Sequence, residues 1–103
     1  EVASLYNELM DNWESLDLSS LSILKVAEAL ARFWWSYIGI HPLENENRRS
    51  AWVHIYEATK NKTKFEIINP TLVEKILMRG DPVKDLPQLQ TAFLYSLKLR
   101  SPK

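Results

Sequence analysis

Residues 22–39, with the sequence SILKVAEALARFWWSYIG, decide the fold of this 103-residue chain. Apolar side chains recur there at intervals of three and four residues, which is typical of a helix. Toward Gly39 they cover most of the helix circumference, so other elements have to enclose this helix. The spacing therefore predicts a central helix, with caps for its start in the segment 17–22. Its apolar positions are Ile23, Val26, Ala27, Leu30, Phe33, Trp34, Tyr37 and Ile38.

Two further helices are expected on either side of this central helix in the sequence. Residues 2–15 alternate between an apolar and an acidic face, which predicts an amphipathic helix. A third helix includes Ala51, Trp52, Ile55 and Tyr56 and ends in the polar segment 60–63. The apolar positions of the first of these helices are Val2, Leu5, Tyr6, Leu9 and Trp13, opposite Glu1, Glu8, Asp11 and Glu14.

The second half of the chain predicts two more helices. Asn69-Pro70 supplies a cap followed by the residue best suited to the first helical position, and Gly80 ends the helix that follows. Asp81 or Asp85 can cap a last helix, and a basic tail follows over residues 98–103. The apolar positions of these helices are Leu72, Val73, Ile76 and Leu77 in the first, and Leu86, Leu89, Phe93, Leu94 and Leu97 in the second.

Residues 64–68 are the one segment with the composition of a strand. Because no plausible partner strand is recognisable, we expect an extended connector there. The sequence thus predicts an all-α fold of about five helices in a single compact domain over residues 1–103. Repeats, low-complexity linkers and domain boundaries are not apparent.

The composition restricts the classes of function. At 12.0 kDa the chain has room for one hydrophobic core, and its 46% hydrophobic residues are enough to order it. There are no cysteines, which excludes a disulfide framework, a thiolate metal site and a cysteine nucleophile. The net charge is zero and the basic residues are spread over several segments, so we expect no nucleic-acid partner. No apolar run is long enough for a membrane span, and we expect no membrane partner and a cytoplasmic location.

The nine residues HPLENENRR, at positions 41–49, are the segment best suited to chemistry. They contain one imidazole, two carboxylates, two carboxamides and two guanidinium groups. Because the third helix begins near the end of this segment, its exposed N–H groups and positive dipole end would face whatever the turn encloses, which favours an anion. His41, with an ordinary pKa near ~6.5, is suited to accept a proton from an attacking hydroxyl.

This segment resembles the signature of the Fic/Doc proteins, His-x-Phe-x-(Asp/Glu)-(Gly/Ala)-Asn-(Gly/Lys)-Arg. His41, Leu43, Asn47 and Arg49 fall on the pattern, and the resemblance extends over residues 24–60. It implies a small all-helical fold in which the motif joins two central helices. It also implies a transferase that moves AMP (AMPylation) or, in Doc-type members, a phosphoryl group from a nucleoside triphosphate such as ATP to a Ser, Thr or Tyr hydroxyl of a target protein.

The resemblance also implies roles for individual residues. His41 would be the general base, Asn47 would help to hold the nucleotide phosphates, and Arg49 would clamp a phosphate group, which makes these three the candidate catalytic residues. Leu43 would be the apolar anchor of the turn. The candidate nucleotide-binding positions are Glu46, Asn47, Arg48, Arg49 and Ser50.

The departures from the signature leave a second function open. Asn45 stands where the family has its magnesium-binding acid, and a carboxamide is a poorer ligand for Mg²⁺ than a carboxylate, so Glu44 or Glu46 would have to assist. Glu46 replaces a small residue and adds negative charge beside the expected phosphate. Arg48 and Trp52 bring the chain closer to the Doc-like branch. The alternative is therefore a catalytically degenerate Fic-like interaction module, as part of a toxin–antitoxin pair with an antitoxin partner or of an effector delivered into a host cell.

Three aromatic or imidazole side chains outside the motif have ordinary structural explanations. His54 has no companion at the spacing of metal ligands, so we expect a surface or packing role. Trp34 and Trp35 are adjacent in a helix and diverge by about 100°. One of them is therefore expected to fill the core while the other borders a groove.

Overall fold

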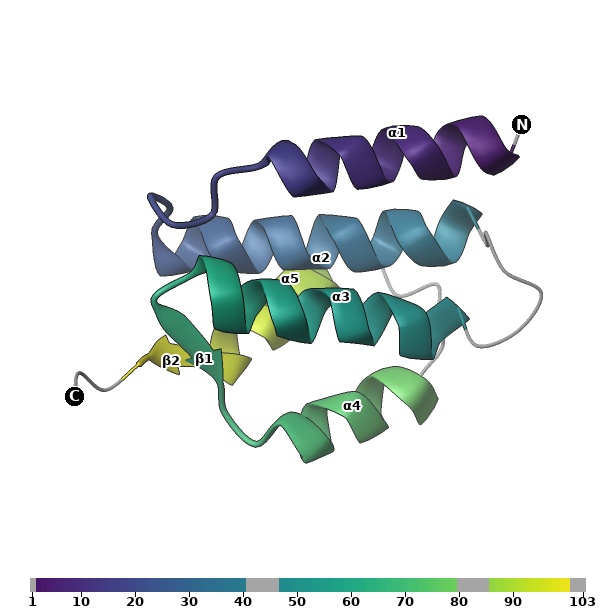
Figure 1. Cartoon of the computed structure of the whole chain (residues 1–103). Coiled ribbons are helices and arrows are strands. Elements are labelled where there is room, and N and C mark those ends of the chain that lie inside the picture. Colours follow the sequence, from purple (N-terminus) through teal and green to yellow (C-terminus); the bar gives the residue numbers. More distant parts are fainter. Residues whose placement is uncertain (1, 41–46, 80–85, 101–103) are drawn as a thin grey trace.

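The computed structural model describes residues 2–40, 47–79 and 86–100 and, within these ranges, has five helices and two short strands (Figure 1). The predicted helical fold of five helices is confirmed. The elements in chain order are α1 (Val2–Ser15), α2 (Ile23–Ile40), α3 (Asn47–Lys62), β1 (Phe65–Ile67), α4 (Pro70–Arg79), α5 (Leu86–Ser96) and β2 (Leu97–Leu99).

The helix α2 is the centre of the molecule, as its sequence predicts. It packs against α1, α3 and α5, while α4 lies on the outer side of α3 (Figure 1). Trp34 is 2% exposed and Trp35 is 47% exposed, so the first fills the core and the second faces outward. The buried apolar side chains of α2 are Val26, Ala27, Leu30, Ala31, Phe33, Trp34 and Tyr37.

The turn between α1 and α2 is held by side-chain caps. Asp17 Oδ1 accepts hydrogen bonds from the Ser19 hydroxyl at 2.6 Å and from the Ser19 N–H at 3.1 Å. These bonds hold the pKa of the Asp17 carboxyl below its ordinary value of 3.8. Ser22 Oγ accepts a bond from the Lys25 N–H at 3.3 Å, which is the geometry of a helix N-cap. The expected caps in the segment 17–22 are therefore present.

Residues 65–67 and 97–99 correct the sequence-based interpretation. The segment 64–68, expected as a connector without a partner, contains β1, which pairs antiparallel with β2. The register joins Phe65 with Leu99, Glu66 with Lys98 and Ile67 with Leu97. Leu97 was assigned to the last helix and 98–99 to a basic tail, but α5 ends at Ser96 and the chain continues directly as a strand.

The start of α4 follows the predicted cap. Asn69 has a φ of 51°, in the left-handed region that asparagine tolerates better than most residues. Its side-chain oxygen accepts a hydrogen bond from the Leu72 N–H at 3.3 Å, and Pro70 occupies the first helical position. Gly80, Asp81 and Asp85, which were expected to end α4 and to cap α5, lie outside the described residues.

Candidate functional site

The motif segment connects the two helices that it was expected to connect. Helix α2 ends at Ile40 and α3 begins at Asn47, and the two helices pack against each other. The remaining motif positions are outside the described residues, so the roles expected for them stay predictions. These positions are His41, Leu43, Glu44, Asn45 and Glu46.

The other half of the motif forms the first turn of α3. Asn47, its first residue, is 7% exposed, whereas Arg49 is exposed. Arg48 and Ser50 are half-buried. Asn47, Arg48 and Arg49 each have interaction partners in the structure. The structure thus places a buried carboxamide and an accessible guanidinium two residues apart at one helix end.

The charge at this helix end is unusual. The first turn of α3 carries two arginines and no acid, although the positive end of a helix dipole favours negative charge. Two guanidinium groups and several exposed N–H groups therefore contribute positive potential at the same place. This arrangement favours an anion at the start of α3.

A partly buried hydrogen bond links this turn to α2. The Tyr37 hydroxyl and Ser50 Oγ are 2.8 Å apart, and Tyr37 is 1% exposed. Burial raises the pKa of the Tyr37 hydroxyl above its ordinary value of 10.0, although the hydrogen bond with Ser50 acts in the opposite direction. Ser50 therefore links α3 to α2, and its expected contact with a nucleotide stays a prediction.

An aromatic cluster supports the same end of the helix pair. The ring of Tyr37 lies 5.9 Å from Tyr6 of α1, 5.6 Å from Phe33 of α2 and 5.9 Å from His54 of α3. His54 also meets Phe33 edge to face at 5.8 Å. These contacts confirm the packing role expected for His54. They join three helices into a rigid base next to the motif.

Another polar cluster was not foreseen in the sequence. One guanidinium nitrogen of Arg100 donates to the carbonyl of Phe65 at 2.9 Å and to that of Thr59 at 3.3 Å. Arg100 directly follows β2, so this side chain ties the end of the strand to the end of α3. The contact lies beside a cavity of about 450 Å³. The alternating Lys-Leu-Arg pattern over residues 98–100 is the available signal of a strand, although its two cations also favour the interpretation as a basic tail.

Metal-ligand clusters and membrane-spanning helices are both absent from the described ranges 2–40, 47–79 and 86–100. No group of three or more His, Asp or Glu side chains that could hold a metal ion occurs among these residues. Asn45 and Glu44, the expected magnesium ligands, are outside them. In the same ranges, no helix combines the length and the apolar character that a membrane span requires.

Comparison with known proteins identifies no relative of this chain. No family model matches the sequence, and no match is found among curated proteins or solved structures. Any functional assignment therefore depends on the residues of the chain and their arrangement.

Proposed function

We propose that the protein is a Fic/Doc-type transferase that moves a nucleotidyl or phosphoryl group from a nucleoside triphosphate to a hydroxyl of a target protein. The observation that carries the proposal is the position of the motif between α2 and α3, with Asn47 and Arg49 on the first turn of α3. The resemblance in sequence associates these two residues with phosphate binding. The positive potential at this helix end supports the same role.

The proposed chemistry uses three side chains. The His41 imidazole accepts the proton of the attacking hydroxyl, whose oxygen forms a bond to phosphorus while the bond to the leaving group breaks. Attack on the α-phosphorus transfers AMP and releases pyrophosphate, whereas attack on the γ-phosphorus transfers phosphate and releases ADP. Asn47 and Arg49 hold the phosphate oxygens on which negative charge shifts during the transfer.

In the proposed mechanism Mg²⁺ would contribute its positive charge and no other chemistry. The ion would neutralise phosphate oxygens, with Asn45 and Glu44 as its expected ligands. A carboxamide in the place of an acid predicts a weak site. Activity should therefore require more Mg²⁺ than a site with two carboxylates, and Asn45→Asp should lower the Mg²⁺ concentration needed for half-maximal transfer.

The experiment is a transfer assay with ATP labelled at either the α or the γ phosphate. The protein is incubated with a cell lysate, Mg²⁺ and one labelled ATP, and labelled proteins are separated on a gel. Label from the α position indicates AMP transfer, and label from the γ position alone indicates phosphorylation. His41→Ala and Arg49→Ala are each expected to lower transfer by about 100-fold or more, because general-base catalysis and phosphate clamping each contribute factors of this order.

A matched variant separates a specific loss from a general effect of substitution on α3. Lys60→Ala removes an exposed cation from the far end of that helix and should retain transfer within a few-fold of the wild type. If neither label is transferred and His41→Ala changes nothing, the enzymatic proposal is wrong. The degenerate interaction module then explains the departures at Asn45 and Glu46 better.

A further inference from the structure

A groove of about 470 Å³ lies between α1 and α2, on a part of the molecule that the proposed function does not use. Trp13 and Phe33 form its floor, with their rings stacked at 4.2 Å and 26°. Leu9 of α1 and Leu16, which directly follows the last residue of α1, line one side of it. The groove is therefore apolar along its floor and along one side.

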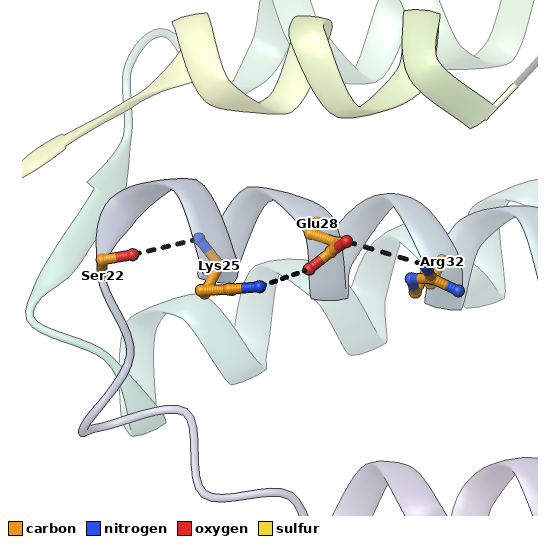
Figure 2. Close-up of polar contacts among 4 residues, drawn as sticks. All are labelled: Ser22, Lys25, Glu28 and Arg32. Atoms are coloured by element: carbon orange, nitrogen blue, oxygen red, sulfur yellow. Dashed lines mark hydrogen bonds and ion pairs between the residues drawn. The ribbon is translucent and has the colours of Figure 1, made fainter.

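The other side of the groove is formed by charged residues of α2. The Glu28 carboxylate forms ion pairs with Lys25 and with Arg32, each at 3.6 Å. The three side chains follow one another along the helix (Figure 2). Both cations are largely exposed, and ion pairs this exposed are weak and exchange partners easily. Because one carboxylate faces two cations, this side of the groove keeps a net positive charge.

Helix α1 has the complementary pattern on its own surface. Leu5, Leu9 and Asn12 follow each other at intervals of four and three residues, which places them on one stripe of α1, and Leu16 follows directly after the helix ends at Ser15. Leu5 and Leu16 are exposed although they are large and apolar. Glu8 borders the stripe, is exposed, and forms no ion pair within the described part of the chain.

We propose that a second copy of the chain covers this groove, with α1 of each copy lying in the α1–α2 groove of the other. In this two-fold symmetric dimer, Glu8 of each copy meets Lys25 and Arg32 of the other copy. The contact is reciprocal because α1 forms one side of the groove and also carries the stripe that fills it. The four helices form a bundle that buries Leu5, Leu9 and Leu16 over the aromatic floor.

The charge arrangement favours a second copy over an unrelated occupant. Glu8 is exposed on α1 beside the stripe, and Lys25 and Arg32 lie on the neighbouring helix without pairing with it. Within one copy these charges do not meet, whereas in the proposed dimer Glu8 of one copy faces the two cations of the other. The proposal does not depend on the transferase activity.

Sedimentation equilibrium of the full chain over a wide concentration range tests the dimer by charge reversal. The wild type should dimerise, and Glu8→Lys should raise the dissociation constant about tenfold or more, because each dimer contains two copies of the contact. Lys25→Glu combined with Arg32→Glu should have the same effect. The triple variant that carries all three changes should restore the wild-type constant to within a few-fold, since the charges are then complementary again.

Glu14→Lys is the matched control, because it reverses an acid of the same helix away from the stripe. It should change the dissociation constant by no more than about twofold, and circular dichroism should show that every variant retains its helix content. A wild type that stays monomeric up to millimolar concentration overturns the proposal. So does a dimer that Glu8→Lys leaves unchanged, or one that the triple variant fails to restore.

Discussion

At the scale of single residues, the best defined polar contact next to the motif is the one between Tyr37 and Ser50. It joins the last turns of α2 to the first turn of α3 over a distance of 2.8 Å. Tyr37 is almost fully buried as a residue, so its hydroxyl has little access to water and gains from a protein partner. The contact therefore restricts how α3 begins, and with it the positions of Asn47 and Arg49.

The raised pKa of Tyr37 predicts how stability depends on alkaline pH. Because the folded-state pKa lies above the unfolded value of 10.0, the contribution of the neutral hydroxyl is complete below pH 10.0 and is lost as the pH rises through the folded-state pKa. Unfolding free energies measured between neutral and alkaline pH should therefore fall more steeply for the wild type than for Tyr37→Phe. Parallel curves for the two proteins would contradict this assignment.

Asp17 predicts the opposite dependence at acid pH. Its folded-state pKa lies below 3.8, so its contribution is complete above pH 3.8 and is lost as the pH falls through the folded-state value. Ser19→Ala removes the hydroxyl that lowers this pKa, and an NMR titration of the Asp17 carboxyl should show the pKa moving back toward 3.8. Ser22→Ala, which alters the neighbouring cap of α2, should leave the titration of Asp17 unchanged; an equal shift in both variants would refute the assigned cause.

At the scale of elements, the helices were predictable from the sequence and the strands were not. Helix α1 could be predicted from residues 2–15 alone because its apolar period is a local signal. The sheet depends on a pairing across about thirty residues, and neither strand is long enough to stand out by itself. Leu97 also continues the helical spacing of Leu89, Phe93 and Leu94. This spacing predicts Leu97 in the last helix, whereas α5 ends one residue earlier, at Ser96.

The strand β2 provides a matched pair of leucines. Leu97 is 5% exposed and pairs with Ile67, whereas Leu99 is 62% exposed and pairs with Phe65. Leu97→Ala should lower the unfolding free energy by about 2–5 kcal/mol, the usual cost of emptying a buried leucine site. Leu99→Ala should cost less than about 1 kcal/mol. Urea denaturation measures both, and equal costs would mean that Leu97 does not fill a buried site at its end of the strand.

At the scale of the whole molecule, the sequence predicted the place of the candidate site but not its interior. The apolar residues before position 41 and after position 49 define two packed helices, and their ends determine where the motif lies. The Tyr37–Ser50 contact was not predictable, because a hydroxyl pair thirteen residues apart leaves no periodic signal. The same holds for Arg100, whose partners Thr59 and Phe65 come close to it only through the fold.

The central position of α2 makes the fold a single cooperative unit. Because α1, α3 and α5 all pack on α2, none of them keeps its apolar face covered once α2 loses its packing. Trp34→Ala empties the site of an indole that is 2% exposed and should cost about 3–5 kcal/mol, a large share of the ~5–15 kcal/mol typical of a whole domain. Trp35→Ala, at the adjacent but 47% exposed position, should cost less than about 1 kcal/mol.

Thermal unfolding distinguishes this cooperative fold from a set of independent helices. Far-ultraviolet circular dichroism reports the helices together, and the fluorescence of the three remaining tryptophans reports the surroundings of α1, α2 and α3 through Trp13, Trp35 and Trp52. In Trp34→Ala both signals should shift to a lower temperature by the same amount and stay coincident, because every layer depends on α2. Two separate transitions would mean that α1 or α3 stays folded without the central helix, and that the motif is anchored by only one of the helices it connects.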